Sequence, residues 1–294
     1  MLDKKLFVII LIQYLEKEEK LKKTTLYNTL GIFLISVLTV LPFINANAGT
    51  EVPSSIKNKG KIVFCTELAY PPWEMINAET QKPDGFDVDL AAAITNTLGV
   101  KSEHNDIGFD ALIPSLQAGQ CDAIISGLAN RPKRREVVDF VDYAIAGNSL
   151  LTKADSNAYF NSLEDLSGLK VSVAVGSYLE DELKTANEAI KNAGKSEMKI
   201  ISLTSGTDAF QQLVAGLADV YLGSTDQSGY FNKQKPGLVR IASPQLLTLT
   251  VGIATLHKDK DLHNAIKSAL KEMMDNGEYQ KVLDKWGFEA MTIE

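Results

Sequence analysis

The chain has 294 residues, of which 45% are hydrophobic and 23% charged, and its 37 Asp and Glu outnumber its 30 Lys and Arg to give a formal charge of −7. This composition is typical of a globular protein with room for one large or two medium domains. The acidic balance disfavours binding to nucleic acid or to an anionic membrane surface, because both require a basic face.

The first 48 residues predict export. A basic segment, residues 20–23, precedes an uncharged apolar run over residues 30–40, and a small-residue pattern follows and ends at Ala48. This order is typical of a secretory signal peptide, with cleavage expected after Ala48 and the mature protein in the periplasm. A single membrane anchor is the alternative, but a spanning helix needs about 20 apolar residues. Residues 1–48 are therefore interpreted as an N-terminal extension and a cleaved signal peptide.

The rest of the chain alternates strand and helix patterns, which predicts an α/β fold. Residues 61–66 form a β-rich run, and residues 85–100 contain a predicted helix with Asp87 as its candidate N-cap and its stop at Gly99. Residues 109–119 predict a second helix, and residues 121–126 a buried strand.

One pattern occurs twice, about a hundred residues apart. Residues 116–127 and 213–224 share Leu-x-Ala-Gly-x-x-Asp followed by a strand, and an Asp-Ala pair precedes each copy. The repeat indicates two similar α/β lobes rather than one long sheet. Because ligands of open parallel sheets lie beyond the carboxyl ends of the strands, the site is expected in the loops that follow them. These loops cover residues 67–73, 126–134, 176–178 and 223–226.

Several segments resemble a known family: TELAYPPWEM, GFDVDLAAAI, FDALIPSLQAGQCDAIISGLANRPKRREVVDF, SLEDLSGLKVSVAVGS and LDKWGF. In this order and spacing, over residues 61–288, the chain is similar to the polar-amino-acid class of periplasmic solute-binding proteins (bacterial extracellular solute-binding protein family 3), which serve ABC importers. The resemblance implies a two-lobed periplasmic-binding-protein fold of type II, with two crossover segments that form a hinge. It places residues 56–147 and 249–294 in one lobe and residues 148–248 in the other.

The resemblance implies a binding protein rather than an enzyme. We expect it to capture an amino acid or a related carboxylate-bearing solute between the closing lobes and to present the closed form to a membrane permease. A monomer is expected, without a cofactor, and the scattered His residues predict no metal site. The alternative is a cyclohexadienyl (prephenate or arogenate) dehydratase-like enzyme on the same scaffold, with Glu67 or Asp226 as the proton donor.

Four cations, Arg131, Lys133, Arg134 and Arg135, follow a predicted strand. Pro132 suits the first position of a helix, which would place Arg134 in the first turn. A guanidinium there can hold a carboxylate by two parallel hydrogen bonds. The resemblance assigns Arg134 to the carboxylate of the ligand, and the other three cations are interpreted as solvated surface charges.

Aromatic residues of the first loops are expected to wall the ligand pocket. The resemblance implies that Tyr70 and Phe109 stack on the side chain of the ligand, with Trp73 beside them. Glu67 matches a position that touches ligand side chains in members of the family that bind cations.

Small and hydroxyl residues of the later loops are expected to complete the site. The resemblance implies that Ser126 and Gly127 supply backbone acceptors and donors, and that the hydroxyl of Ser177 caps the ligand carboxylate. Further contacts are predicted from Leu128, Ala129, Tyr178, Ser224 and Asp226.

Two positions depart from the family pattern. Members that bind α-amino acids usually carry a hydroxyl and an Asp as ammonium acceptors where this chain has Ala129 and Ser224. An unmet charged hydrogen bond in a buried site costs more than the ~1–3 kcal/mol of a neutral one. The chain is therefore predicted either to bind an acid without a free α-amine or to use another acceptor. The candidate acceptors are Glu67 and Asp226. Asp226 would share a strand face with Ser224 if the strand continued beyond residue 224.

The two cysteines, Cys65 and Cys121, lie on strands predicted to be neighbours. A disulfide is consistent with an oxidising periplasm, but it requires Cα atoms within ~7 Å. The positions of the two residues along their strands look offset, so the sequence leaves the pairing open.

Overall fold

The computed structural model describes residue 13, residues 16–20 and residues 52–293. The chain divides into two units, Met1–Gly49 and Thr50–Glu294. In the first unit the described residues are helical, and the predicted signal-cleavage site lies outside the described residues. Within the part of the chain that is described, no helix combines the length and the apolar character needed to cross a membrane.

The second unit alternates strands and helices, as the sequence predicts. Its strands are β1 (Lys61–Thr66), β2 (Ala69–Tyr70), β3 (Glu74–Ile76), β4 (Pro83–Asp84), β5 (Lys101–Asp106), β6 (Ala123–Ile124), β7 (Val138–Lys153), β8 (Lys170–Ala174), β9 (Lys199–Leu203), β10 (Val220–Ser224), β11 (Val239–Ile241) and β12 (Leu247–Leu256). Its α-helices are α2 (Ser54–Lys59), α3 (Phe86–Thr97), α4 (Leu112–Gln117), α5 (Pro132–Arg135), α6 (Tyr178–Asn192), α7 (Gly206–Val214), α8 (Asp226–Gln234), α9 (Lys260–Asn276) and α10 (Glu278–Trp286). Short 3-10 helices are η1 (Phe109–Ala111), η2 (Leu163–Leu166) and η3 (Glu289–Met291).

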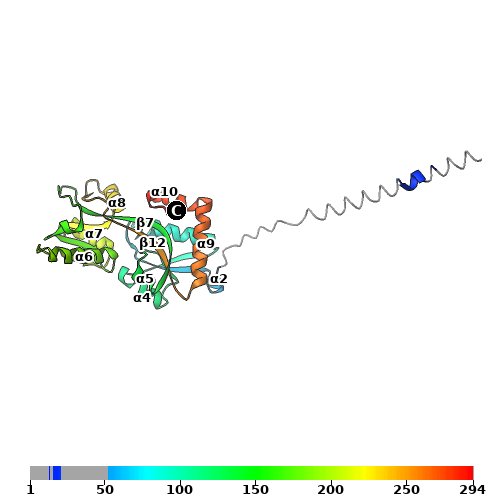
Figure 1. Ribbon diagram of the computed structural model, residues 1–294, viewed down its shortest axis with the longest axis horizontal. Helices are drawn as coiled ribbons and strands as arrows, with labels where there is room; N and C mark the ends of the chain where they lie inside the picture. Colours follow the sequence, from blue (N-terminus) through cyan, green and yellow to red (C-terminus); the bar gives the residue numbers. More distant parts are fainter. Residues whose placement is uncertain (1–12, 14–15, 21–51, 294) are drawn as a thin grey trace, which may run out of the picture. The chain divides into compact units, whose positions relative to one another are not determined.

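A nine-stranded mixed sheet in the order β5-β1-β6-β12-β7-β10-β8-β9 forms the centre, with β11 against β7, and β2, β3 and β4 form a small separate sheet. The parallel pairs β1–β5 and β8–β9 lie toward opposite ends of the sheet. In Figure 1, α6, α7 and α8 gather at one end of this unit and α4, α9 and α10 at the other, with β7 and β12 between them.

The strands β7 and β12 are the two segments that connect these ends. They pair antiparallel from Leu247 opposite Asn148 to Leu256 opposite Val138, with an irregularity between Val251 and Gly252. Most side chains of β7 are buried, as expected for a central strand covered on both faces. Both strands therefore have fixed neighbours along most of their length.

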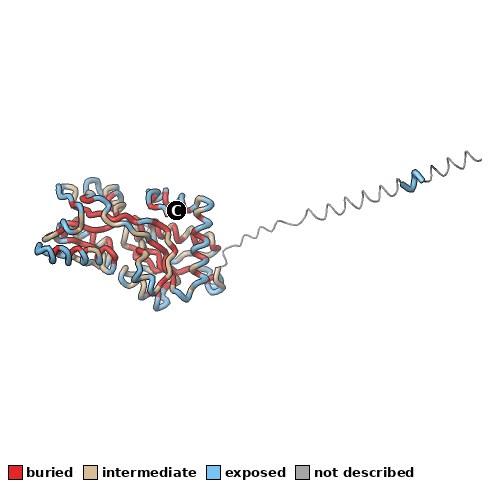
Figure 2. The backbone as a smooth tube through the Cα atoms, in the orientation of Figure 1, coloured by how far each residue is buried: buried red, intermediate tan, exposed pale blue. Residues whose placement is uncertain are grey.

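Buried residues occur at both ends of the sheet (Figure 2). Two clusters draw their residues from 56–146 and 251–291. Two others draw theirs from residues 150–242 together with Ala129. Each end of the sheet therefore has apolar packing of its own.

The predicted N-cap of the helix that begins near residue 86 is wrong. Gly85 occupies the N-cap position of α3, with a φ of 127°. A Cβ atom there would lie 2.4 Å from the carbonyl oxygen of Trp73, so the close approach requires glycine. Asp87 is instead fully buried and accepts hydrogen bonds from the amide of Gly127 (2.7 Å) and the hydroxyl of Tyr143 (2.9 Å).

Cys65 and Cys121 form a disulfide, with Cα atoms 5.6 Å apart. Cys65 lies opposite Ile124 in the β1–β6 pair, whereas Cys121 precedes β6. The bond closes across the offset because the chain before β6 approaches β1, where the amide of Asp122 donates to the carbonyl of Val63 (2.7 Å).

Replacing both cysteines by Ser should lower the free energy of unfolding. The bridge spans a sequence separation of 56 residues, and closing a loop of that size in the unfolded chain corresponds to about 4 kcal/mol. Urea denaturation of the oxidised wild type and of the double Ser variant measures this difference. An unchanged midpoint would contradict it, and the reduced wild type should behave like the variant.

Candidate functional site

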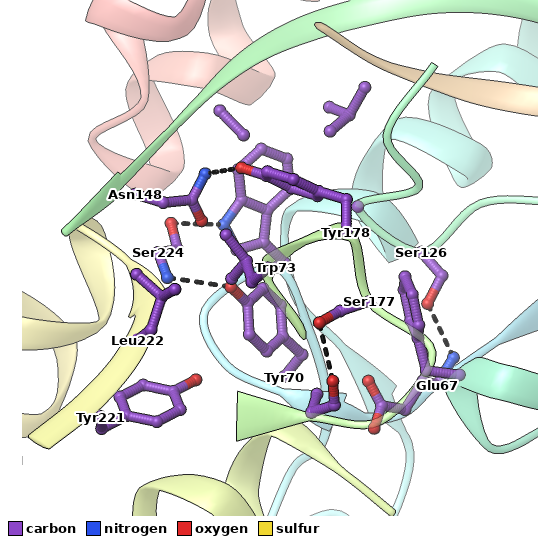
Figure 3. Close-up of a pocket in the computed structure, with 16 residues that line it drawn as sticks. Glu67, Tyr70, Trp73, Ser126, Asn148, Ser177, Tyr178, Tyr221, Leu222 and Ser224 are labelled. Atoms are coloured by element: carbon purple, nitrogen blue, oxygen red, sulfur yellow. Dashed lines mark hydrogen bonds between the residues drawn. The ribbon is translucent and has the colours of Figure 1, made fainter. Parts of the chain in front are cut away.

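A cavity lies at the carboxyl ends of β1 and β6 on one side and of β8 and β10 on the other (Figure 3). Its volume is about 50 Å³, which is space for about four water molecules. The wall is mostly aromatic and aliphatic. It is lined by Glu67, Tyr70, Trp73, Phe109, Ser126, Gly127, Ala146, Asn148, Ala174, Ser177, Tyr178, Leu179, Tyr221, Leu222, Ser224 and Val251.

The structure brings most of the predicted site residues to this wall. The residues at the wall are Glu67, Tyr70, Trp73, Phe109, Ser126, Gly127, Ser177, Tyr178 and Ser224, and those away from it are Leu128, Ala129, Arg134 and Asp226. The wall holds a carboxyl group but no Lys or Arg. No group of His, Cys, Asp and Glu among the described residues is arranged to hold a metal ion.

Arg134 lies beside the cavity rather than in its wall. Pro132 begins α5, as predicted, and the guanidinium lies 5.6 Å from the centroid of the Phe109 ring. Its Nη1 donates to the carbonyl of Ala129 (3.0 Å) and its Nη2 to the carbonyl of Gly176 (3.2 Å). Burial lowers the pKa of Arg134 to about 10, so the group is still a cation at neutral pH. Each terminal nitrogen keeps a second N–H that is available to an anion.

The other cations of the cluster do not line the cavity. Arg131 is half-buried rather than fully solvated, since it pairs with Glu182 (3.2 Å) and lies 5.7 Å from the ring centroid of Tyr178. Lys133 and Arg135 are exposed, as predicted for surface charges.

Leu128 and Ala129 belong to the core rather than to the wall. Each is 1% exposed. The carbonyl of Leu128 accepts from the amide of Gly252 (3.0 Å), and Ala129 forms a bridge to Val251. Both side chains are packed in the apolar core beside β12. Leu128 and Ala129 therefore do not line the cavity, where the sequence predicted them to contact the ligand.

Asp226 lies behind Ser224. The strand β10 ends at Ser224 and Asp226 begins α8, so the condition for a shared strand face is not met. The hydroxyl of Ser224 nevertheless donates to Asp226 Oδ2 (2.5 Å) and accepts from the indole nitrogen of Trp73 (3.2 Å). Burial raises the pKa of Asp226, and no ion pair to it is found among the described residues. A second carboxyl group, that of Asp226, is therefore separated from the cavity by the side chain of Ser224.

Glu67 is the carboxyl group in the wall itself. It is 3% exposed, and its Oε1 accepts from the amide of Gly206 (3.2 Å). Burial, reinforced by nearby acidic groups, raises the pKa of Glu67 to about 8. The carboxyl is mostly protonated at neutral pH, and a cation placed against it would favour loss of that proton.

The donors predicted at Ser126 and Gly127 are used inside the protein. The hydroxyl of Ser126 accepts from the amide of Glu67 (2.9 Å) and donates to Glu74 Oε1 (2.8 Å). The amide of Gly127 donates to Asp87. Both protons therefore point to buried carboxyl groups outside the cavity wall rather than into the cavity.

The hydroxyl of Ser177 is also used within the fold. Ser177 is the N-cap of α6, where its Oγ accepts from the amide of Glu180 (3.2 Å) and donates to the carbonyl of Ala174 (2.7 Å). The hydroxyl that was predicted to cap the ligand carboxylate therefore caps a helix.

Seven wall residues were not predicted: Ala146, Asn148, Ala174, Leu179, Tyr221, Leu222 and Val251. Tyr221 and Leu222 lie in the second copy of the repeat, directly before Ser224, so the repeat gave a signal that could have found them. Asn148 reaches the site because β7 passes it, and its amide donates to the hydroxyl of Tyr178. Nothing in the local sequence marks that position.

Hydrogen bonds cross the cavity between segments far apart in the sequence. The amide of Ser224 donates to the hydroxyl of Tyr70 (2.9 Å), and the hydroxyl of Thr207 donates to the carbonyl of Ala69 (2.7 Å). The approach requires glycine at Gly206, where a Cβ atom would lie 2.2 Å from the Tyr70 ring. The two walls are therefore in direct contact.

The Glu67 carboxyl should titrate near pH 8. A carboxyl ¹³C NMR titration of the wild type should show a resonance with that midpoint, and Glu67→Gln should lack it. Because the pKa is raised, the stability that Glu67 contributes is present at acid pH and is lost as the pH rises from about 4.5 to about 8. A spectrum in which Glu67→Gln removes only a resonance that titrates near its ordinary value would contradict the buried, protonated state.

Comparison with known proteins gives a consistent result. The model of the bacterial extracellular solute-binding proteins, family 3, matches residues 62–289. The arginine-binding extracellular protein ArtP of Bacillus subtilis is 31% identical over 255 residues, covering 86% of this chain and 96% of that protein. The ABC transporter arginine-binding protein 1 of Escherichia coli is 30% identical over 234 residues, covering 77% and 90%.

Solved structures agree with these sequence matches. An ancestral arginine-binding protein bound to arginine superposes with a TM-score of 0.71 at 35% identity, covering 77% of this chain and 98% of that one. The predicted two-lobed periplasmic-binding-protein fold and the family resemblance are confirmed. The relatives are named as binding proteins, which confirms the expectation of a binding protein rather than an enzyme.

Proposed function

The chain belongs to the bacterial extracellular solute-binding proteins, family 3, and from this premise we propose that it captures an α-amino acid with a cationic side chain, arginine first, for an ABC importer. The observation that carries this proposal is the buried carboxyl of Glu67 in a wall that holds no Lys or Arg. Several relatives are named for binding arginine and others for binding histidine. A buried acid next to aromatic rings favours a ligand that brings a cation.

In this proposal, residues 56–147 and 249–294 form one lobe and residues 148–248 the other, with β7 and β12 as the crossover segments. The hydrogen bonds across the cavity and its volume of about 50 Å³ correspond to lobes that are closed on each other. An amino acid needs more space than about four water molecules. Entry therefore requires a hinge motion that separates the two walls.

Arg134 supplies the charge for the carboxylate of the ligand. Its guanidinium already joins Ala129 on one side of the cavity to Gly176 on the other. Exchange of these two carbonyl acceptors for a carboxylate would keep the guanidinium hydrogen-bonded and would neutralise its charge.

The ammonium group of the ligand is held by Ser224 together with Asp226. The hydroxyl of Ser224 lies at the wall and Asp226 Oδ2 is 2.5 Å behind it, so the pair offers a charge where the family usually has a single Asp. This favours an amino acid with a free α-amine over an acid without one. The hydroxyl acceptor that Ala129 lacks is then not needed to hold the ammonium group.

The location and partners follow from the same premise. We infer that residues 1–48 direct export and are removed after Ala48, and that the mature chain acts in the periplasm as a monomer. Its protein partner is the membrane permease of the importer, which recognises the conformation with the lobes closed.

Arginine should stabilise the mature chain, and Arg134→Ala should reduce that effect to about a third or less. Saturating arginine at a hundred times its dissociation constant adds ~2.7 kcal/mol, or roughly 5–11 °C in Tm. Removing one side of a buried charge pair should weaken binding about 30-fold or more. Arg135→Ala is the matched control, because Arg135 is exposed and bonded to Asn130. Equal thermal shifts in the two variants would contradict the role of Arg134.

Asp226→Asn should weaken the binding of arginine without weakening that of 5-guanidinopentanoate, which is arginine without its α-amine. Loss of a charged hydrogen bond corresponds to about a tenfold change in affinity. Isothermal titration of both ligands into wild type and variant measures it. Equal losses for the two ligands would show that Asp226 does not hold the amine.

A further inference from the structure

Two buried carboxyl groups do not line the cavity but bind residues of its wall. Glu74 begins β3 and Asp87 lies in the first turn of α3, and both side chains are 0% exposed. Gly85 lets the two elements approach, since a Cβ atom there would lie 2.7 Å from the Cα of Glu74. The pair sits directly under the turn formed by Ser126 and Gly127.

Each carboxyl group holds one residue of that turn. Glu74 Oε1 accepts from the hydroxyl of Ser126 (2.8 Å). Asp87 Oδ2 accepts from the amide of Gly127 (2.7 Å) and from the hydroxyl of Tyr143 (2.9 Å). Hydrogen bonds to Glu74 and Asp87 therefore hold both residues of the turn in place.

The remaining oxygens of the pair, Glu74 Oε2 and Asp87 Oδ1, are buried and accept from no donor. No ion pair to either residue occurs among the described residues. Two uncompensated charges in such a place would cost several kcal/mol each, whereas a proton between the free oxygens satisfies both. The two carboxyl groups are close enough to act on each other's pKa.

We propose that Glu74 and Asp87 share one proton between Glu74 Oε2 and Asp87 Oδ1, and that this pair positions the Ser126–Gly127 turn with its hydroxyl proton and the Gly127 amide proton directed away from the cavity. The hydroxyl proton of Ser126 goes to Glu74 and the amide proton of Gly127 goes to Asp87. The turn then favours a ligand rich in donors, such as an ammonium or a guanidinium. This last step rests on the proposed function, and the shared proton does not.

The proton should leave a signature in the pH dependence of stability. Burial raises the pKa of Asp87 to about 7 and that of Glu74 well above its ordinary value. The folded chain thus binds a proton that the unfolded chain has released above about pH 5, so the stability from this pair falls as the pH rises toward 7. The titratable groups that face the pair are Tyr143 from β7 and Glu67 from the end of β1.

Urea unfolding of the ligand-free chain between pH 5 and 7 tests the shared proton. The unfolding constant of the wild type should rise up to about tenfold more per pH unit than that of Glu74→Gln, because one linked proton gives one decade. Asp87→Asn should flatten the curve equally, since either amide can donate to the remaining carboxylate. The double amide variant should flatten it no further. Glu67→Gln is the matched control and should remove a separate, additive proton.

Curves for Glu74→Gln and Asp87→Asn as steep as that of the wild type would overturn the shared proton. Twice the flattening in the double variant would overturn it as well, because it would mean two independent protons rather than one. Both single variants keep size and hydrogen-bonding capacity, so one serves if the other fails to fold.

Arginine binding tests the positioning. Glu74→Gln, which keeps an acceptor for Ser126, should bind within about threefold of the wild type, and Glu74→Leu, which keeps none, should lose about tenfold or more. A folded Glu74→Leu variant that binds like the wild type would overturn the positioning role. If the wild type itself binds no arginine, the proposed function fails while the unfolding experiment still decides the shared proton.

Discussion

The strands β7 and β12 lie antiparallel along most of their length, and the geometry of the site depends on that pairing. They are the central strands of a sheet whose two ends have separate cores. Their register brings Ala146 and Asn148 of one strand and Val251 of the other to the cavity wall. The irregularity next to Val251 falls at Gly252, where a Cβ atom would lie 2.9 Å from Asp142 Oδ1. A shift of this register would move the two walls relative to each other.

The charge state of the site is determined by buried carboxyl groups that are not paired with Lys or Arg. Glu67 lies in the wall, Asp226 lies one residue behind it, and Glu74 and Asp87 lie beneath the turn. A buried carboxyl group is stable when it is protonated or accepts several hydrogen bonds. A ligand cation can replace the proton of Glu67, whereas the acids beneath the turn remain inside the protein. The same physical rule thus gives one carboxyl a role in recognition and the lower pair a role in holding the turn.

The sequence was sufficient for the fold and for the region of the site, and less so for individual contacts. Alternating patterns and the repeat placed the loops after β6 and β10 correctly, because backbone periodicity and strand ends are local properties. The hydroxyl of Ser177 shows the limit, since only the folded chain reveals that it caps α6. Arg134 was predicted to hold the ligand carboxylate, but the structure places it outside the cavity wall, 5.6 Å from the centroid of the Phe109 ring, and this placement depends on tertiary packing. Asp87 resembled an N-cap because its role requires Gly127 and Tyr143, which are distant in sequence.

The central claim is that a buried, protonated Glu67 accepts the cationic end of the ligand. Calorimetric titration of L-arginine at pH 7 in buffers of different ionisation enthalpy tests it most directly, because binding must then expel the proton of Glu67. The pKa of about 8 predicts release of about one proton per arginine in the wild type and none in Glu67→Gln. Arginine binding to the wild type with no proton release would contradict the claim.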